Sequence, residues 1–442
     1  MVLLKNFINI FNVPELRKKF LFTLGILVVY RLGNHIPLIN INISQLEQLM
    51  SQTTSLLGGL FSYIDLFSGG SLRQCTIFSL GIAPYITASI MMQMLSMSVP
   101  FLEQLSKEGE YGRKIINQYT RYLALAVSFL QGVMYVSVVE SQGLMLTPGW
   151  FYRSVFVLSL VVGTMFVMWL GEQISLRGLG NGSSVIIFAG IIARFPDDII
   201  KILGAVQEGY ITVFVAILIA ALVVAIAGCI VFLEKGERKV PVQYSRRIVG
   251  NKIYGGQSTY IPFKINPAGV MPVIMSNAVL NIPLFLLSWL ANRFDALKVI
   301  TESLIRGGLV YNVINFVLIV FFTFFYTALI FNPDELADNI KKSGGFIPGI
   351  RPGHKTAEFF NHILTRLGLV GALYIAGLAL VPSLLQYMIS LPFYLSGILS
   401  GTALLIGVGV ALELAAQIES YLIENRYEGF LMSGRMRGRR LR

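Results

Sequence analysis

The sequence contains few charged residues for its length. Asp, Glu, Lys and Arg make up 13% of its 442 residues, whereas an ordinary soluble protein carries about 25%. Hydrophobic residues make up 55%, and the mean hydropathy is +0.70. This composition excludes a set of ordinary water-soluble domains and indicates that much of the chain lies in lipid.

Cysteines and catalytic motifs are also scarce. The two cysteines, Cys75 and Cys229, lie far apart in apolar sequence, which excludes a disulfide framework and a CxxC metal or redox site. We expect both to be small buried hydrophobic residues. The three histidines show no metal-ligand spacing, and the GxGxxG, GxxxxGK and HExxH motifs are absent. We therefore expect no enzyme site, no metal and no cofactor.

Ionisable residues are nearly absent from the middle of the apolar runs. Ion-coupled transporters and proton relays usually depend on such residues, and the exceptions here are Glu413 and Glu172. Glu413 is either a proton or cation site or a structural cap near the cytoplasmic end of its helix. The scarcity weighs against an ion-coupled transporter.

Ten long apolar runs account for the composition. A helix needs about 20 mostly apolar residues to cross a bilayer, because the hydrocarbon core is about 30 Å thick and each residue rises about 1.5 Å. A count of nine or eleven is also compatible with the runs alone. We predict an all-α polytopic membrane protein with ten spans, at residues 20–38, 76–97, 122–139, 155–170, 184–199, 211–232, 268–290, 309–331, 367–384 and 394–415.

The basic residues favour ten spans. The formal net charge is +12, with 35 Lys and Arg against 23 Asp and Glu. With ten spans, 27 of the 35 basic residues lie in the N-terminal segment, in the loops on the same side and in the tail. Because cytoplasmic loops carry the excess of Lys and Arg, this division predicts that both termini lie in the cytoplasm.

The predicted domain organisation follows from this count. Ten spans divide into two sets of five, and an odd number in each set inserts the second half upside down relative to the first. We therefore expect two inverted five-helix halves around a central pore. The predicted parts are a cytoplasmic segment at 1–19, the N-terminal half at 20–232 with the sixth span beginning the second half at about 211, a basic loop at 233–267, spans seven to ten at 268–415 with a basic loop at 332–366, and a basic tail at 416–442.

One apolar stretch is too short to cross the membrane. Residues 56–67 read LLGGLFSYIDLF and precede Ser68, Gly69 and Gly70. The stretch either dips back into the helix bundle, where surrounding protein can cover its backbone, or lies as an amphipathic helix on the outer membrane surface.

Isoleucines recur beside glycine and proline in four of the spans. Glycine and proline allow close approach or bending, so these isoleucines could line a narrow pore that excludes ions by dewetting. Alternatively they pack against neighbouring helices or face lipid, as isoleucines in membrane helices usually do. The runs are Gly81 to Ile86, Phe188 to Ile192, Gly269 to Ile274 and Leu404 to Gly409.

Several motifs, taken in order, make the sequence similar to a known family. They are Gly81 to Ile90 with Gln93, Glu108-Gly109-Glu110, Gln118 to Arg121, Gly180-Asn181-Gly182, Gln257-Ser258-Thr259, Asn332-Pro333 with Ala337-Asp338-Asn339, and Lys341 to Gly353. In this order they resemble the SecY family, the channel subunits of the bacterial protein translocase. The resemblance runs from about residue 13 to the tail and covers all ten predicted spans.

The resemblance implies an hourglass channel with a hydrophobic constriction, a plug and a side opening between spans two and seven. The constriction would be formed by Ile82, Ile86, Ile191, Ile274 and Ile406. The plug would be a short re-entrant helix at about residues 59–71, with an apolar face of Leu60, Ile64, Leu66 and Phe67. The polar members of the lateral gate would hold a closed seam by hydrogen bonds of about 1 kcal/mol each. The gate residues would be Thr87, Ile90, Gln93, Gln131, Ser276 and Asn277.

The resemblance also implies partners. Two basic protrusions would dock the motor SecA and the ribosome, whose RNA phosphates attract Lys and Arg, although cytoplasmic orientation alone also produces basic loops. The docking residues would be Arg238, Lys239, Arg246, Arg247, Lys252, Lys341, Lys342, Arg351 and Lys355. The pair Asn251-Lys252 departs from the basic pair expected in this family. Small SecE-like and SecG-like membrane subunits, signal peptides, unfolded preproteins and membrane lipids would be the other partners.

The predicted function is that of a protein-conducting channel. It would translocate unfolded preproteins across the bacterial plasma (inner) membrane and release apolar segments laterally into it. A partner motor or the ribosome would supply the energy, because the chain has no phosphate-binding loop. The alternative from another class is a secondary transporter for a small solute, and a plastid homologue is also compatible with the sequence.

Overall fold

The computed structural model of the chain describes residues 13–41, 68–72, 74–141, 143–147, 149–209, 211–244, 247–249, 252–254, 258–291, 308–389 and 401–438. The chain forms two compact units. Unit 1 comprises residues 1–207, 393–398 and 410–442, and unit 2 comprises residues 208–392 and 399–409.

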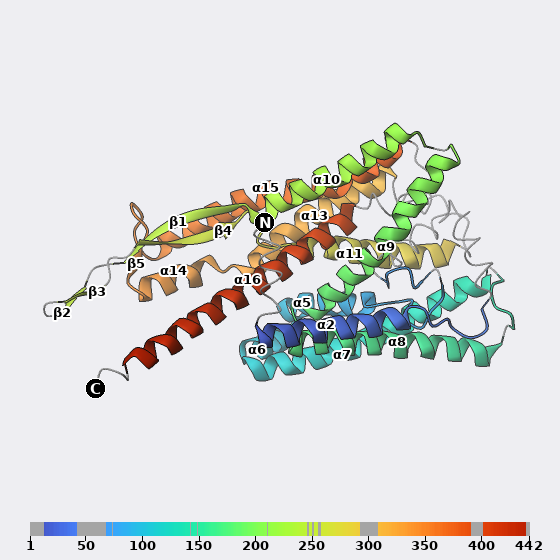
Figure 1. Cartoon of the computed structure of the whole chain (residues 1–442), viewed down its shortest axis with the longest axis horizontal. Helices are drawn as coiled ribbons and strands as arrows, with labels where there is room; N and C mark the ends of the chain where they lie inside the picture. Colours follow the sequence, from blue (N-terminus) through green and yellow to red (C-terminus); the bar gives the residue numbers. More distant parts are fainter. Residues whose placement is uncertain are drawn as a thin grey trace. The chain divides into compact units, whose positions relative to one another are not determined.

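Unit 1 is a bundle of long helices. They are α2 (Pro14–Gly33), α5 (Ala83–Ser98), α6 (Pro100–Lys107), α7 (Glu110–Ser141), α8 (Trp150–Arg177), α9 (Gly182–Gln207) and the part of α16 (Gly401–Gly438) from residue 410 on (Figure 1). Helix α7 packs against α5 and α8, and α8 also contacts α2 and α9. The chain bends by 99° between α5 and α6, because Val99 is extended and Pro100 opens a new helix.

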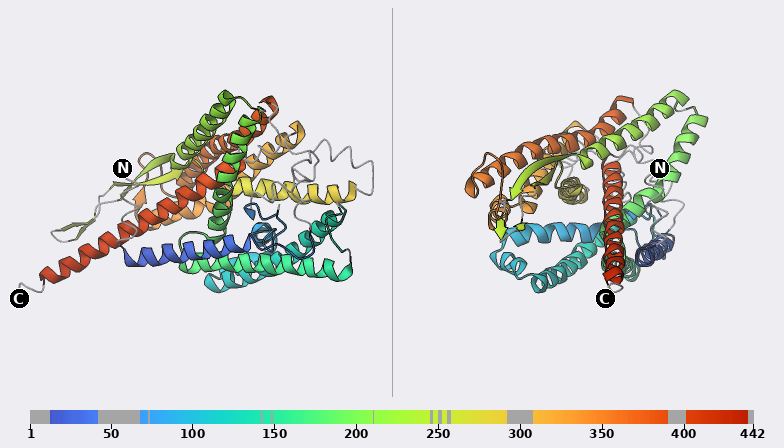
Figure 2. Two further views of the ribbon diagram at one scale, coloured as in Figure 1. Left: turned by 45° about the vertical axis from the view of Figure 1, so that its right-hand side comes forward. Right: turned by 60° about the vertical axis from the view of Figure 1, so that its left-hand side comes forward.

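Unit 2 is a second helical bundle. Its helices are α10 (Val213–Lys235), α11 (Met271–Ala291), α13 (Leu309–Ile330), α14 (Pro333–Lys342), α15 (His354–Ile389) and the first turns of α16. Helix α13 packs against α11 and α15, and α14 packs against α15. Asn332 caps α14, since its side chain accepts a hydrogen bond from the backbone N–H of Asp334 at 3.2 Å. Figure 2 shows α16 as one continuous helix, although its residues are divided between the two units.

Each of the ten predicted spans overlaps one helix, in the order α2, α5, α7, α8, α9, α10, α11, α13, α15 and α16. Within the described part of the chain, six helices are long and apolar enough to cross a membrane, or seven if the bent pair of α5 and α6 is one span. Charged residues set α2 and α9 apart from these, near both ends of α2 and from Arg194 to Lys201 in α9, and α11 contributes only the shorter apolar stretch Met271–Leu280. The helical architecture agrees with the prediction, and the count of ten spans stays a prediction.

The second predicted span becomes helical later than expected. The apolar run starts at Thr76, but α5 starts at Ala83. The hydroxyl of Ser79 donates to the carbonyls of Ser71 and Thr76 at 3.2 and 2.6 Å, and Gly81 has a φ of +54°. Side chains that bind nearby carbonyls compete with helix formation, so the residues before Ala83 form turns.

A small β-structure in unit 2 was not predicted. Strand β1 pairs antiparallel with β4, from Glu237 opposite Lys264 to Gln243 opposite Ser258, and β5 pairs with β1 at Gln243 and Phe346. A separate hairpin is formed by β2 and β3. The first basic loop therefore contributes four strands, and the second contributes one. The strands are β1 (Glu237–Tyr244), β2 (Arg247–Val249), β3 (Lys252–Tyr254), β4 (Ser258–Lys264) and β5 (Gly345–Phe346).

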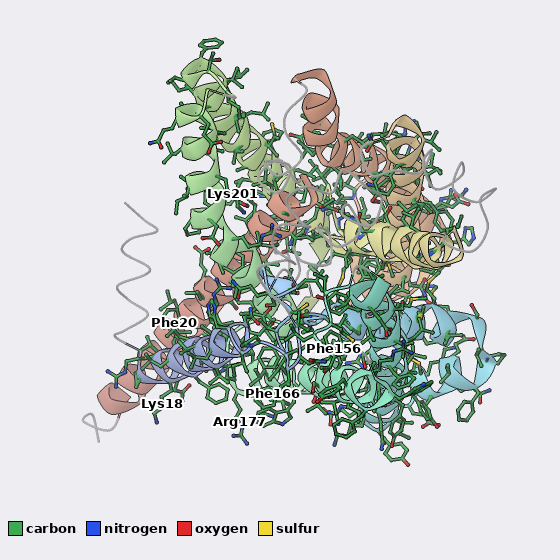
Figure 3. All side chains as sticks on the ribbon, turned by 90° about the vertical axis from the view of Figure 1, so that its right-hand side faces the viewer. Lys18, Phe20, Phe156, Phe166, Arg177 and Lys201 are labelled. Atoms are coloured by element: carbon green, nitrogen blue, oxygen red, sulfur yellow. The ribbon has the colours of Figure 1, made fainter. Side chains whose placement is uncertain are left out.

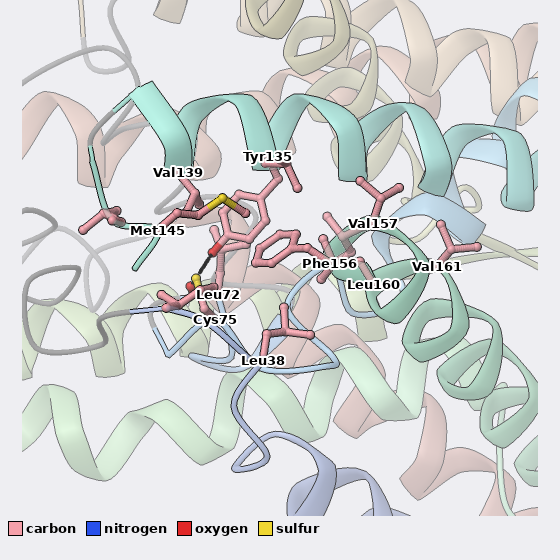
Figure 4. Close-up of a cluster of buried hydrophobic side chains, with 14 residues drawn as sticks. Leu38, Leu72, Cys75, Tyr135, Val139, Met145, Phe156, Val157, Leu160 and Val161 are labelled. Carbon is pink, nitrogen blue, oxygen red and sulfur yellow. Dashed lines mark hydrogen bonds between the residues drawn. The ribbon is translucent and has the colours of Figure 1, made fainter. Parts of the chain in front are cut away.

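A buried cluster fixes the loops at one end of unit 1 to α7 and α8 (Figure 4). The hydroxyl of Tyr135 lies 2.7 Å from the sulfur of Cys75 and donates to the carbonyl of Leu72 at 3.0 Å. Cys75 is buried as expected, but the expectation for Cys229 is wrong, since it is exposed. Helix α10, which carries Cys229, is apolar on all sides, so its sequence does not mark which face is buried.

Candidate functional site

Three side chains at the end of α2 hold the last residues of the predicted plug. The Tyr30 hydroxyl and the Asn34 side-chain amide each donate to the carbonyl of Ser68 at 3.3 Å. The Arg31 guanidinium donates to the carbonyl of Gly69 at 3.1 Å. A buried carbonyl without a partner costs about 1–3 kcal/mol, so these donors stabilise the turn. We call residues 68–72 the anchor segment.

Two glycines bring the anchor segment into backbone contact with α9. Gly69 has a φ of +70°, and a Cβ on it would lie 2.9 Å from the Cα of Gly190. Both the left-handed backbone and the close approach require glycine at this position. The contact places the anchor segment beside Ile191, the candidate pore residue that follows Gly190 in the chain.

The apolar face of the predicted plug, Leu60, Ile64, Leu66 and Phe67, lies outside the described residues. Only the end of the predicted plug, from Ser68 to Ser71, is described. Both of these serines are buried, with exposed fractions of 0% and 1%. This end of the plug is therefore part of the packed interior.

The candidate pore isoleucines are divided between the two units. Ile82 and Ile86 lie about one turn apart at the start of α5, and Ile191 lies on α9. Ile82 is fully buried against α8, whereas Ile86 and Ile191 are partly exposed. In unit 2, Ile274 lies in the first turn of α11 and Ile406 near the start of α16, and both are buried. A ring of all five residues stays a prediction.

The lateral-gate candidates of unit 1 lie on α5 and α7. The Thr87 hydroxyl donates to the carbonyl of Ala83 in its own helix at 3.0 Å. Ile90 is buried, and Gln93 and Gln131 are partly exposed. Thr87 therefore already has a hydrogen-bond partner within α5.

The lateral-gate candidates of unit 2 are also bonded within their own unit. The Ser276 hydroxyl donates to the side-chain oxygen of Asn315 on α13 at 2.6 Å. The Asn277 side-chain amide donates to the carbonyl of Val273, one turn earlier in α11, at 2.8 Å. Ser276 therefore braces α11 against α13.

The two predicted basic protrusions form a single folded body in unit 2. Strand β5 of the second loop pairs with β1 of the first, and one buried cluster joins this sheet to α14 and the start of α15. We call residues 237–244, 258–264 and 333–364 the basic platform. The buried cluster consists of Val240, Val242, Phe263, Ala337, Ile340, Ile347, Ala357, Phe360, Ile363 and Leu364.

Arg351 stands on a closely held turn of the basic platform. Its side chain is exposed, while Ile347 belongs to the buried cluster and Ile350 packs against it. The carbonyl of Arg351 accepts a hydrogen bond from the Thr356 hydroxyl at 3.0 Å. A charge on a preorganised turn loses little conformational entropy when it binds a partner, which makes Arg351 a favourable docking residue.

Two other basic residues of the platform are engaged by nearby carboxylates. Lys239 Nζ lies 3.1 Å from Glu237 Oε1 and 4.8 Å from the ring centroid of Tyr260, and the bond to Glu237 raises the pKa of Lys239. Lys355 Nζ lies 2.8 Å from Glu358 Oε2, and this hydrogen bond lowers the pKa of the Glu358 carboxyl. The charges of Lys239 and Lys355 are thus partly neutralised on the platform itself.

The structure describes the side chains of three of the remaining docking candidates, only the strand register of two, and nothing of one. Arg238, Lys341 and Lys342 are exposed and, like Arg351, form no ion pair among the described side chains. Arg247 and Lys252 lie on the β2–β3 hairpin, opposite Tyr254 and Val249, and Arg246 lies outside the described residues. Four docking candidates on the platform are therefore exposed and outside the described ion pairs, namely Arg238, Lys341, Lys342 and Arg351, and Lys264 at the end of β4 is a further exposed cation.

Sequence reasoning missed several residues that shape the site. Arg31, Asn34 and Asn315 interrupt apolar runs, and a polar residue in a membrane helix normally needs a partner there. That signal was present for each, but the partners of Arg31 and Asn34 lie more than 30 positions away in the chain. Among the residues that the structure describes, no group of three or more His, Cys, Asp or Glu could hold a metal ion.

Comparison with known proteins decides the family. A family model described as SecY matches residues 76–415. The chain belongs to the SecY family. It is 44% identical to the protein translocase subunit SecY of Aquifex aeolicus, over 96% of this chain and 98% of that protein. It is 41% identical to the protein translocase subunit SecY of Escherichia coli strain K12, over 96% of both proteins.

Solved structures with the same fold are similar over nearly the whole chain. One, described as "The structure of a protein conducting channel", has a TM-score of 0.63 at 18% identity and covers 91% of this chain and 92% of that one. Another, "Sec61 in the Canine ribosome-channel complex from the endoplasmic reticulum", has a TM-score of 0.59 at 17% identity, with coverage of 91% and 92%. The predicted fold class is confirmed as a helical membrane channel fold of the SecY type.

Proposed function

We propose that the chain is the protein-conducting channel of a bacterial plasma-membrane translocase. It moves unfolded preproteins across the membrane and releases apolar segments sideways into lipid. The observation that carries this function is the identity of 41–44%, over nearly the full length, to protein translocase subunits SecY. The chain is a channel subunit and not an enzyme, and the motor SecA or the elongating ribosome supplies the energy.

Both ends of the chain lie on the cytoplasmic side of the membrane. In unit 1, Lys19 Nζ lies 3.1 Å from the Tyr421 hydroxyl and 4.2 Å from the centroid of its ring. Leu16 and Leu179 pack at the same place with Leu414. Lys19 precedes the first predicted span and Tyr421 follows the tenth, so their contact supports an even number of crossings between them. The excess of Lys and Arg assigns that side to the cytoplasm.

The alternation of loops within unit 1 supports the same topology. Asn40, after the first predicted span, bonds Thr147, before the fourth, through three hydrogen bonds of 2.8–3.2 Å. Two loops predicted to lie outside the cell are therefore in contact. At the predicted cytoplasmic ends of α2 and α8, Lys18 and Arg177 are exposed and point away from the helices (Figure 3).

The resting channel is closed by the isoleucine ring and the plug. The ring of Ile82, Ile86, Ile191, Ile274 and Ile406 excludes water and therefore ions. The contact between Gly69 and Gly190 supports the plug assignment, because it holds the end of residues 59–71 beside Ile191. An entering chain displaces the plug and passes through the ring.

The lateral gate lies between α5 and α11. Thr87, Ser276 and Asn277 all have hydrogen-bond partners within their own units. Separating the two sides of the gate therefore breaks none of these three hydrogen bonds, and each bond kept avoids a cost of about 1–3 kcal/mol for an unpaired buried group. The side-chain oxygen of Asn277 is buried without a hydrogen-bond partner among the described residues. Ile90, Gln93 and Gln131 complete the gate, and a signal peptide can open it at low cost.

The basic platform docks the motor and the ribosome. Its exposed cations outside the described ion pairs, Arg238, Lys264, Lys341, Lys342 and Arg351, suit an acidic protein surface or RNA phosphates. Two solved structures with this fold are described as ribosome complexes, one of canine Sec61 and one of the yeast Ssh1 complex. SecE-like and SecG-like subunits complete the assembly, as the family resemblance implies.

Reconstitution tests the proposed function. The full chain is placed in proteoliposomes with its single-span partner subunits, and SecA, ATP and a preprotein are added. We expect ATP-dependent protection of the preprotein from external protease. A preparation that leaves the preprotein digestible but accumulates a small solute would overturn the proposal and favour a secondary transporter.

A second experiment tests the pore ring. Replacing Ile86 and Ile274 by asparagine should raise the ion conductance of the channel in planar bilayers, because a polar side chain lets water persist in the constriction. Ile192→Asn is the matched control, since Ile192 follows the ring residue Ile191 but is 50% exposed. Equal conductance of the ring and control variants would refute the ring assignment.

A further inference from the structure

A buried side chain clamps the base of the basic platform. Strand β4 leads into α11 through residues 265–270, which are neither helix nor strand. Within them, Asn266 is only 3% exposed. Its side-chain amide donates to Glu234 Oε1 at 2.8 Å and to the carbonyl of Gly269 at 2.9 Å. One side chain thus holds the last turn of α10 to the residues that precede α11.

The backbone beside Asn266 is held equally closely. The N–H of Ile265 donates to the carbonyl of Gly236 at 2.9 Å, which extends the pairing of β1 and β4 by one step. A Cβ on Gly371 of α15 would lie 2.6 Å from the carbonyl oxygen of Ile265. The sheet, α10 and α15 therefore meet at the residue directly before Asn266.

On the other side of the clamp, the start of α11 is locked into the core of unit 2. Val270 and Val273 pack in one cluster with Ile230 and Leu233 of α10. The N–H of Ile274 donates to the carbonyl of Val270 at 3.3 Å. The candidate pore and gate residues of α11 therefore begin where the clamp ends.

We propose that Asn266 is a positioning residue that couples the basic platform to α11. Force on the platform from a docked macromolecule passes through the bonds of Asn266 to Glu234 and Gly269 and reaches the first turn of α11. Without these bonds, the irregular residues 265–270 would absorb the movement instead of transmitting it. This inference rests on the proposed function, because it requires a motor that docks on the platform.

Three variants isolate the clamp. Asn266→Asp keeps the shape of the side chain but removes the amide that donates both bonds, and at a pH where both carboxyls are ionised it sets one carboxylate against Glu234 and the carbonyl of Gly269. Glu234→Gln is the matched control, because its side-chain oxygen still accepts the bond from Asn266. In the double variant E234Q/N266D the new amide can donate to the new carboxylate, which restores one of the two bonds.

The readout separates docking from transmission. In the reconstituted complex, the affinity for SecA and the maximal rate of preprotein translocation are measured separately. For N266D we expect an affinity within about twofold of the original chain and a maximal rate lower by about fivefold or more, the pattern of a group that acts after binding. E234Q should retain the original rate, and the double variant should recover part of it.

Other outcomes are equally decisive. An unchanged maximal rate for N266D would overturn the coupling. The proposed function would still stand in that case, because the original chain translocates the preprotein. Absence of translocation by the original chain would overturn the proposed function and the inference with it. If N266D does not fold, Asn266→Ala replaces it: the same separation of rate from affinity supports the coupling, and a parallel loss of both assigns Asn266 a structural role only.

Discussion

The anchor segment of unit 1 and the basic platform of unit 2 are both built from loops between helices, but they are held in opposite ways. Polar side chains hold the anchor segment by bonding its carbonyls, as Tyr30 and Arg31 do. An apolar cluster under a sheet holds the platform, with Phe263 and Phe360 inside and cations outside. The anchor segment is therefore stabilised through contacts to its backbone. In the platform, buried apolar side chains provide the stability and exposed cations form the surface that a partner can bind.

The largest expected effect comes from the interior of the platform. Phe360 is 0% exposed, and its ring centroid lies 5.3 Å from that of Phe263. Phe360→Ala should destabilise the platform by about 3–5 kcal/mol, because it leaves a cavity. Amide hydrogen exchange in β1 and β4 should then accelerate strongly. Phe346→Ala is the control, since Phe346 in β5 is 38% exposed, and an equal acceleration would contradict the role of the buried cluster.

The next effect comes from the backbone contact of the anchor segment. Gly69→Ala should cost about 1–2 kcal/mol for the left-handed backbone and about 1–3 kcal/mol more for the collision with Gly190. Gly70→Ala is the control, because Gly70 also has a positive φ, of +93°, but no atom within 4 Å of its Cβ position. Thermal unfolding of the purified protein measures both. Equal losses would show that the Gly190 contact contributes nothing.

A smaller effect, on docking rather than folding, is expected at the surface of the platform. Arg351→Glu should lower SecA-driven translocation by about tenfold and leave assembly intact, because it reverses an exposed charge on a fixed turn. Lys355→Glu should have a weaker effect, since Glu358 already engages Lys355. Export of a secreted reporter measures both variants. Normal export with Arg351→Glu would remove Arg351 from the docking site.

The smallest expected effect is the pH dependence of the first turn of α15. Lys355 lowers the pKa of Glu358 below its usual 4.5, so the charged form is favoured in the folded state. Its stabilising contribution is therefore present above pH 4.5 and is lost as the pH falls through the lowered value in the folded protein. Unfolding midpoints measured down this pH range should fall slightly less for Glu358→Gln. Parallel curves would mean that this ion pair adds no stability.

The helical layout could be predicted because lipid imposes it. A chain in the hydrocarbon core must satisfy its backbone hydrogen bonds internally, so each long apolar run becomes a helix. The β-strands of the platform were harder to predict, because β1 pairs with strands from two different loops. The spacing of Val240 and Val242 by two positions was nevertheless a usable sequence signal, and both side chains are buried in β1.

The site was only partly predictable from the sequence. The exposure of Arg351 and of the two lysines at 341 and 342 follows from their charge. The partners of Arg31 and Ser276 do not, because each bond joins residues more than 30 positions apart. Such pairings depend on how the helices pack, which the order of residues along one helix does not record. The isoleucine ring, the plug face and the gate seam stay predictions.

Helix α16 completes unit 1 last. Leu16 and Leu179 precede unit 2 in the sequence, but Leu414 and Ile418, which pack against them, follow it. Chains emerge from the ribosome in order and begin to fold from the N-terminus. Leu414 and Ile418 therefore cannot cover that apolar face of the first unit until the second unit has been made.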